Sequence, residues 1–214
     1  GADPDIIVAP YSGMEKKEYD RLSEIAPTIP FKDIAWKTTW REQLIEAAEA
    51  VGRKAEGEKI VADTDTFIKE TMAKYPELAG KSAALCYISA ADLSNFSVYR
   101  TIDPRAGYLV DMGFRFPEKV EEQATDRNSF YVQISSELAV ETLSDLDIII
   151  TYGDDKTFDA IKNDAIFSKI PAVRDGRVVV LDNKGSLSAA CNPSVLSIKA
   201  ELTSYLDAIS AVVK

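Results

Sequence analysis

Aromatic side chains and an arginine stand where three segments of the chain leave an expected buried strand. These segments are Pro10–Gly13, Ser94–Arg100 and Tyr152–Asp155. Open parallel sheets bind ligands at the carboxyl ends of their strands, so these places are the first candidates for a binding site. Aromatic rings supply flat contact area and arginine pairs with oxyanions, which suits a bulky, partly apolar, anionic ligand. The candidates are Tyr11, Phe96, Tyr99, Arg100 and Tyr152, although such rings can equally complete a hydrophobic core and leave their hydroxyl groups in water.

Asp154 and Asp155 form an acidic pair after the most strand-like run of the chain. Such a pair can hold Mg²⁺ at a phosphoryl-transfer site. One of the two carboxylates can instead cap a helix that begins at Thr157, and capping is favoured because neither G-x-G-x-x-G nor G-x-x-x-x-G-K-[ST] occurs. A Mg²⁺-dependent α/β enzyme on a phosphorylated small molecule is therefore the less favoured hypothesis.

The chain contains no histidine and two cysteines. Histidine is the commonest general base and the commonest transition-metal ligand, and two cysteines are too few for a cysteine-rich zinc site. Catalytic triads and zinc hydrolases are poor hypotheses, and no catalytic or metal-binding residue is assigned. Cys86 and Cys191 form one disulfide in an exported protein or remain two buried thiols, and the thiols are favoured.

Composition and charge exclude several further classes. The 214 residues are 46% hydrophobic and 28% charged, which is typical of a globular protein. Thirty-five acidic against 25 basic residues give a net charge of −10, so a nucleic-acid partner is not expected. No apolar run approaches the roughly 18 residues of a membrane span.

The first part of the chain has the pattern of a strand, a helix and a parallel strand. The strands are expected at 5–10 and 28–31, and the helix at 14–25. Thr39 predicts the N-cap of a helix over 40–51. A long helix over 54–75 follows, and Pro76 ends it.

From about residue 81 the pattern restarts as strands that alternate with helices. Strands are expected at 82–89, 147–152 and 178–181, and helices at 103–113, 136–143, 157–163 and 193–212. This order predicts an α/β, Rossmann-like lobe with a mostly parallel sheet that is covered on both faces. Glu137 lies in the first turn of its helix, where the helix dipole alone explains a carboxylate.

Six motifs, in the same order as the expected elements, carry a family resemblance. They are Pro4–Ala9, Tyr19–Thr28, Trp40–Leu44 with Ala50–Arg53, Leu109–Phe114, Ile134–Leu138 and Ile170–Val178. Together they resemble the iron-siderophore substrate-binding proteins of ABC importers, a family that also includes cobalamin and haem carriers. The resemblance extends over the whole chain.

The resemblance implies two α/β lobes joined by a long helix. Residues 1–38 would be the remnant of the N-terminal lobe, 39–80 the inter-lobe helices and 81–214 the C-terminal lobe. We expect the chain to be N-terminally truncated, without the signal peptide and lipid-attachment site of the family, and its full form to be a periplasmic protein or a membrane-anchored lipoprotein outside the cytoplasm.

The resemblance also implies a role for particular residues. By position, Tyr131 matches an aromatic residue of the family's ligand cleft. Less specific matches to cleft positions are Trp36 and the candidates Tyr11, Phe96, Tyr99, Arg100 and Tyr152. Glu137 matches a glutamate that docks onto the ABC permease. The implied function is capture of a ferric siderophore, not catalysis; haem or cobalamin is the alternative within the family.

A ferric siderophore suits a chain without histidine, because the chelator already saturates its iron with oxygen ligands. No cofactor is implied. Since part of the cleft would be missing, we expect weak ligand binding by residues 1–214. The unpaired edge of the strand near residues 5–9 also predicts self-association.

Overall fold

The computed structural model describes residues 2–154 and 156–213, so Asp155 lies outside the described residues. The chain divides into two compact units, one up to Thr66 and one from Phe67 onward. The division falls within helix α3 (Lys54–Met72). We describe each unit by itself, and the three segments 1–38, 39–80 and 81–214 stay a prediction.

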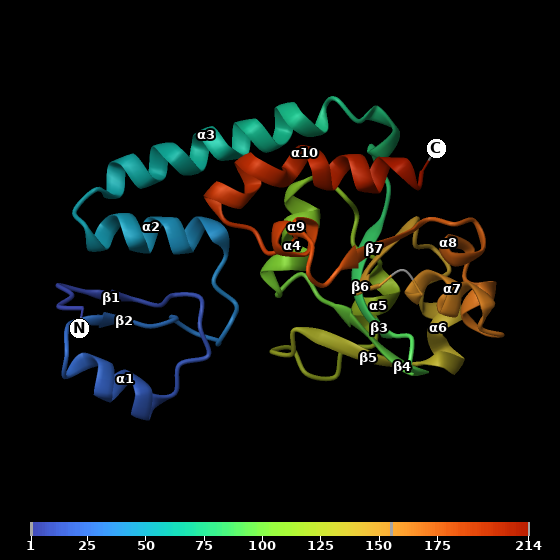
Figure 1. The fold of residues 1–214 in the computed structure, drawn as a ribbon, viewed down its shortest axis with the longest axis horizontal. Helices are drawn as coiled ribbons and strands as arrows, with labels where there is room; N and C mark the ends of the chain where they lie inside the picture. The colour runs from blue at the N-terminus through green and yellow to red at the C-terminus, as the bar shows by residue number, and fades with distance from the viewer. Residues whose placement is uncertain (1, 155, 214) are drawn as a thin grey trace. The chain divides into compact units, whose positions relative to one another are not determined.

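The first unit begins with the expected parallel strand–helix–strand arrangement (Figure 1). Strand β1 (Ile7–Val8) pairs in parallel with β2 (Thr28–Ile29), and α1 (Lys16–Ser23) connects them. Both strands are shorter than predicted. Pro10 and Pro30 follow them closely, and proline has no amide to extend a strand ladder.

Helix α2 (Trp40–Ala50) begins where the sequence predicts. The Thr39 side chain accepts a hydrogen bond from the Glu42 amide, and the Glu42 carboxylate accepts one from the Thr39 amide. This reciprocal pair satisfies two amides of the first helical turn. Gly52, with φ of +70°, follows the helix in the left-handed conformation that glycine adopts without strain.

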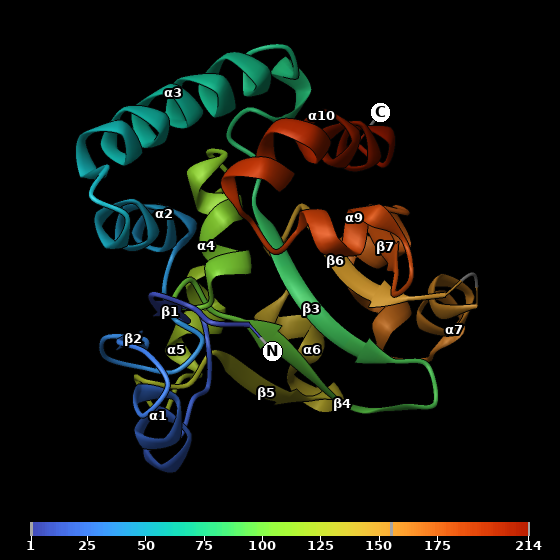
Figure 2. The same ribbon diagram turned by 60° about the vertical axis from the view of Figure 1, so that its left-hand side comes forward.

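The second unit contains a five-stranded sheet in the order β5-β4-β3-β6-β7. The strands are β3 (Ala83–Ser89), β4 (Asp92–Tyr99), β5 (Tyr131–Ser135), β6 (Ile148–Gly153) and β7 (Val178–Asp182). Figure 2 shows β3 crossing the middle of this sheet. Strands β3, β6 and β7 are parallel, β4 is antiparallel to both neighbours, and β5 therefore runs in the direction of β3. The predicted mostly parallel α/β lobe is confirmed, with β4 as the reversed strand.

The helices of this unit include those expected from the sequence, and several short ones that were not. The expected helices are α4 (Pro104–Asp111), α6 (Ser136–Thr142), α7 (Thr157–Asn163) and α10 (Val195–Ala211). The sequence did not predict α5 (Glu118–Glu122), α8 (Pro171–Arg174), α9 (Ser186–Ala190) or the 3₁₀ turns η1 (Pro76–Leu78) and η2 (Phe167–Lys169). Each of these spans little more than one turn, too short to show a helical period.

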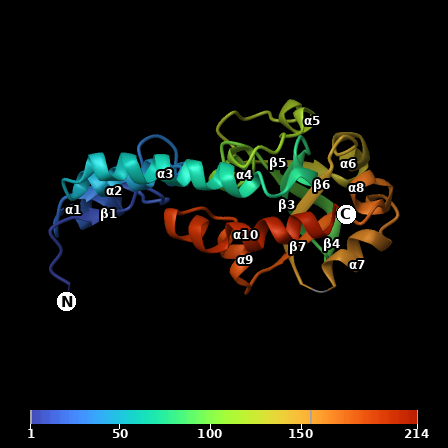
Figure 3. The ribbon, with the colours of Figure 1, turned by 90° about the horizontal axis from the view of Figure 1, so that it is seen from above.

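Helices pack against both faces of the sheet, although Tyr87 and Tyr131 on one of these faces are exposed. Ala84, Cys86 and Ile88 of β3 join a core with α6, α7 and α8 on one face. Leu85 points to the other face by strand alternation, where α4 and α10 contribute the buried Tyr108 and Tyr205. Figure 3 shows α9 beside α10, which it contacts.

The segment 94–100 corrects a prediction, because it forms most of strand β4 instead of a loop after β3. The two strands are joined by a tight turn at Ala90 and Ala91. Neither residue is a typical turn former such as glycine, proline or asparagine, so no local signal marks a hairpin there. The strand assignment changes which side chains of this segment face solvent.

Asp147, directly before β6, binds Ser82, directly before β3. Its carboxylate accepts hydrogen bonds from the Ser82 amide at 2.8 Å and the Ser82 hydroxyl at 3.1 Å. Lys81 Nζ lies 3.6 Å away and Arg115 Nη2 3.7 Å away. Burial alone would raise the pKa of this carboxyl, but the hydrogen bonds from Ser82 and the two cations together hold it below its usual value.

We predict that Asp147→Asn lowers the free energy of unfolding by about 1–2 kcal/mol at pH 7, because a charge-assisted hydrogen bond is lost. A carboxyl whose pKa is depressed on folding stabilises above its unfolded pKa of about 4, and that contribution disappears as pH falls through the folded pKa. Urea unfolding at several pH values should therefore show the difference from wild type shrinking below pH ~4. The exposed Glu70→Gln serves as control, and a difference that persists unchanged at pH ~2 would contradict this account.

Candidate functional site

The strand register gathers tyrosines on one face of the sheet. Tyr99 of β4 lies directly opposite Tyr131 of β5, and Tyr87 of β3 lies opposite Ser97, which shares a face with Tyr99. Tyr87 is 53% exposed and Tyr131 46% exposed. In β6, Thr151 pairs with the core residue Cys86. The next residue, Tyr152, therefore faces the opposite side, the same side as Tyr87. We call these four tyrosines the tyrosine face.

Arg105 adds a cation to the tyrosine face. Its guanidinium carbon lies 4.1 Å from the ring centroid of Tyr99, within cation–π range. Nε and Nη2 donate to the Asp103 carboxylate at 2.9 and 2.7 Å, and Nη1 lies 3.4 Å from the Tyr152 hydroxyl. Burial lowers the Arg105 pKa, but Asp103 outweighs burial and the pKa is raised, so the guanidinium stays charged.

Sequence reasoning did not select Arg105 as a candidate site residue. It identified Asp103 and Pro104 as the start of α4, and the structure confirms that start, since the Asp103 side chain accepts a hydrogen bond from the Arg105 amide. A residue at the second position of such a helix lies close to its cap. The sequence therefore indicates that Arg105 lies near Asp103. It contains no sign that the Tyr99 ring lies beside the guanidinium.

Tyr152 presents a neutral phenol. Burial and the neighbouring Cys191 raise its pKa well above the ordinary value. The Tyr152 hydroxyl lies 2.8 Å from Cys191 Sγ, and the thiol is also 3.1 Å from the Ser188 carbonyl. Both cysteines are free and buried, which confirms the expectation of thiols. Burial raises the pKa of Cys86 to about 12, so that thiol is unreactive.

Two predicted site residues, Phe96 and Arg100, are buried and belong to the interior of the second unit. Phe96 is 2% exposed and its ring meets Phe167 edge to face at 5.2 Å. Arg100 is 7% exposed and its guanidinium binds the Glu121 carboxylate and three backbone carbonyls. In a strand, even- and odd-numbered residues face opposite sides, so these residues point away from Tyr99.

In the first unit, Tyr11 and Trp36 form an aromatic pair. Their ring centroids are 5.4 Å apart and their planes meet at 81°. Trp36 is 49% exposed and has a φ of +62°, a conformation that costs a bulky residue about 1–3 kcal/mol. Its amide donates to the Ser12 carbonyl at 3.0 Å, which helps to hold it there. A groove of about 880 Å³ that includes Gly13, Leu22, Ile25 and Trp36 runs beside the pair.

Asp154, the described member of the acidic pair, serves as a cap. Asp154 accepts hydrogen bonds from the Lys156 amide at 3.0 Å and the Thr157 hydroxyl at 3.1 Å, so it caps the turn before α7. These bonds, that of Lys156 first, lower its pKa. Within residues 2–154 and 156–213, no three His, Cys, Asp or Glu side chains gather in a way that could hold a metal ion. No helix in this described part is long and apolar enough to cross a bilayer.

Glu137 is exposed in the first turn of α6. Its neighbour Leu138 is 44% exposed. The Ser135 side chain, at the N-cap, makes no capping hydrogen bond. A solvated carboxylate on a helical turn is free to pair with a cation on another molecule.

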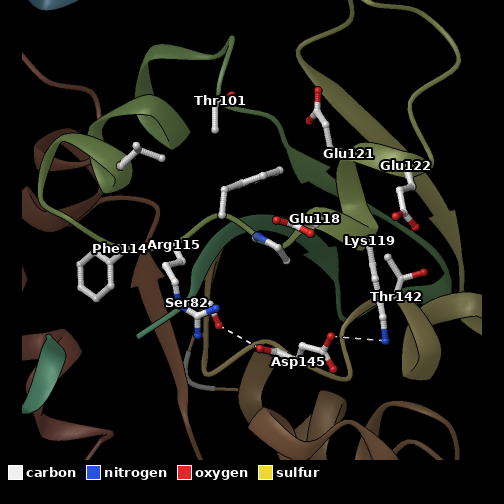
Figure 4. Close-up of a pocket in the computed structure, with 13 residues that line it drawn as sticks. Ser82, Thr101, Phe114, Arg115, Glu118, Lys119, Glu121, Glu122, Thr142 and Asp145 are labelled. Carbon is white, nitrogen blue, oxygen red and sulfur yellow. Dashed lines mark hydrogen bonds and ion pairs between the residues drawn. The ribbon is translucent and has the colours of Figure 1, made fainter. Parts of the chain in front are cut away.

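The second unit also contains a pocket near the amino ends of β3 and β6, lined among others by Ser82, Arg115 and Asp145. Its volume is about 850 Å³. Figure 4 shows the charged side chains that line it, Lys119 and Asp145 among them. Its charges have mixed sign: Lys119 lies 3.4 Å from Asp145, and Arg115 approaches Asp147. Tyr87 and Tyr152 of the tyrosine face stand near the carboxyl ends of β3 and β6, where parallel sheets bind ligands, so we take the tyrosine face as the better candidate site.

Comparisons with known proteins agree with this assignment of the fold. The model of a family described as periplasmic binding protein matches residues 1–184. PiaA of Streptococcus pneumoniae TIGR4, solved in complex with ferrichrome, is 39% identical, with a TM-score of 0.91 over 99% of this chain and 70% of PiaA. FeuA of Bacillus subtilis, solved with ferri-bacillibactin, is 20% identical with a TM-score of 0.65 over 99% of this chain and 71% of FeuA, and shows the fold alone.

Curated relatives give a similar result. The iron(3+)-hydroxamate-binding protein YxeB of Bacillus subtilis (strain 168) is 28% identical over 187 residues, which are 84% of this chain and 56% of YxeB. The probable siderophore-binding lipoprotein YfiY of the same organism is 26% identical over 204 residues, which are 87% of this chain and 60% of YfiY. The chain thus spans somewhat more than half the length of these relatives.

We predict that Gly13→Ala displaces the Trp36 indole, because a Cβ at residue 13 would lie 2.5 Å from the indole Nε1. Iodide quenching of tryptophan fluorescence should change, since Trp36 is the exposed tryptophan while Trp40 is 2% exposed. The same substitution in a Trp36→Phe background is the control and should leave the emission unchanged. An unaltered quenching curve in the otherwise wild-type chain would show that the indole does not rest on Gly13.

Proposed function

The chain belongs to the periplasmic binding protein family, and from this premise we propose that the protein captures a ferric siderophore and delivers it to the permease of an ABC importer. The observation that carries the proposal is the tyrosine face with its stacked cation, Arg105 on Tyr99. PiaA, which is 39% identical, is solved in complex with ferrichrome. Family members are substrate-binding proteins, and the role proposed for this one is likewise binding.

The chemistry of a ferric chelate supports this proposal. Iron in such a complex has its oxygen ligands already, so a carrier needs no histidine or cysteine at the metal. It needs flat surfaces for the chelate and hydrogen-bond donors for its oxygens. The tyrosine face provides rings, the Tyr152 hydroxyl and the N–H groups of Arg105. Tyr11 and Trp36 remain proposed ligand contacts of the first unit.

We further propose a hydroxamate chelate as the class of ligand. YxeB is named as an iron(3+)-hydroxamate-binding protein, and the ferrichrome that PiaA binds is also a hydroxamate. Capture would take place outside the cytoplasm, because the family is periplasmic and YfiY is a lipoprotein. The carrier would then present Glu137, the exposed carboxylate of α6, to basic side chains of the permease.

We predict that ferrichrome quenches the tryptophan fluorescence of the full protein, and that Arg105→Gln weakens its binding by roughly tenfold or more, because a cation–π contact and hydrogen-bond donors are lost. Arg115→Gln is the matched control: Arg115 is an exposed arginine of the charged pocket in Figure 4. Its removal should change affinity less than twofold. If Arg115→Gln weakened binding and Arg105→Gln did not, the charged pocket would be the site.

A ligand screen distinguishes the proposal from the other carriers of the family. Haem or cobalamin binding in place of ferric hydroxamate, seen as a Soret band or a cobalamin absorption that co-purifies, would overturn the siderophore assignment. Failure to bind ferrichrome or any other ferric chelate would overturn the proposed function.

We predict that Glu137→Arg leaves the affinity for ferrichrome unchanged but reduces iron uptake by cells at least tenfold, because charge reversal replaces attraction to the permease with repulsion. Uptake of labelled ferrichrome measures the effect. Glu141→Arg, the same charge reversal on the exposed side of the same helix, is the control and should retain most uptake. Normal uptake by the Glu137 variant would contradict a docking role.

A further inference from the structure

We propose that Asp103 sets the charge selectivity of the tyrosine face, by neutralising Arg105 so that charge-neutral ferric chelates bind in preference to anionic ones. This inference rests on the proposed function and adds a specificity-determining residue to it. Asp103 is buried and does not itself contact the ligand; it acts by compensating the charge of Arg105.

The ion pair is unequally exposed. Asp103 holds the guanidinium at two points, Nε to Oδ1 at 2.9 Å and Nη2 to Oδ2 at 2.7 Å. The Asp103 side chain is 6% exposed, whereas that of Arg105 is 23% exposed. A ligand on the tyrosine face therefore meets the guanidinium but not the carboxylate.

Pairing with Asp103 leaves Arg105 some of its N–H donors but cancels most of the electrostatic field of its positive charge. A guanidinium has five N–H groups, and the Asp103 carboxylate occupies one on Nε and one on Nη2. A third, on Nη1, donates to the Tyr152 hydroxyl at 3.4 Å, and the two that remain can donate to carbonyl oxygens of a chelate. The net charge of the pair is zero, so an anion at this face gains little from long-range attraction and lies close to a buried carboxylate.

The two main classes of ferric chelate differ in charge. Three hydroxamates balance the charge of Fe³⁺ and give a neutral complex, whereas three catecholates leave a trianion. A neutral complex does not depend on attraction to a net positive charge, so it binds no more weakly when Asp103 compensates the charge of Arg105. A trianion would require cations that lack acidic partners, so the Asp103–Arg105 pair disfavours it.

Asp103 also caps α4, since it accepts a hydrogen bond from the Arg105 amide at 2.9 Å. A role that was only structural would weaken the binding of all chelates alike. Asparagine retains the capping acceptor but not the charge, so Asp103→Asn separates the two roles.

The test measures dissociation constants of the full protein for ferrichrome and for the tris-catechol complex of Fe³⁺, by fluorescence quenching. In Asp103→Asn we expect the ratio of the catecholate to the ferrichrome dissociation constant to fall by roughly tenfold or more. Glu121→Gln is the matched control: it also removes a carboxylate from an arginine pair, that of Arg100 on the other face of the sheet. Its ratio should stay within twofold of wild type.

Each other outcome overturns the inference in a distinguishable way. If Asp103→Asn weakens both chelates equally or leaves the ratio unchanged, Asp103 is structural and does not select charge. If Glu121→Gln shifts the ratio as much, total protein charge and not the site controls selectivity. If the wild-type protein binds neither chelate, the proposed function fails and this inference fails with it.

Discussion

Strand alternation in the sheet of the second unit decides which side chains can meet a ligand. Because neighbouring residues of β4 face opposite sides, Tyr99 lies on the open face, whereas Phe96 and Arg100 point to the interior. The pairing of Tyr99 with Tyr131 then brings together two residues that are 32 positions apart in the chain. A slip of one residue in this register would bury the tyrosines and expose the core, so the hydrophobic core fixes the binding face.

The same sheet also explains why the two arginines near residue 100 have different roles. Arg100 leaves β4 on the core side, where a buried cation must be compensated, and Glu121 with three backbone carbonyls compensates it. Arg105 starts a helix on the open side, where part of its guanidinium remains accessible. Arg100 thus stabilises the unit, whereas Arg105 remains available for the ligand contact that we propose.

The sequence predicted the elements whose signals are local. The N-cap at Thr39, the capped turn after Asp154 and the buried run of isoleucines in β6 each depend on residues close in the chain, and all are present. The hairpin at Ala90 and Ala91 was missed because its turn has no characteristic residue. Arg105 was missed for a different reason: its importance comes from contact with Tyr99 and Tyr152, which only the register and the placement of α4 create.

Both aromatic surfaces are held by contacts that do not involve a ligand. The Trp36 backbone is kept at positive φ with the help of a bond to Ser12, and the indole rests against Gly13. The guanidinium of Arg105 is fixed by two bonds to Asp103 before any chelate arrives. Side chains that are ordered in the free protein lose little conformational entropy on binding. A large, rigid chelate, which cannot itself adapt, is best recognised by surfaces of this kind, so selectivity depends on the placement and charge of residues that folding has already fixed.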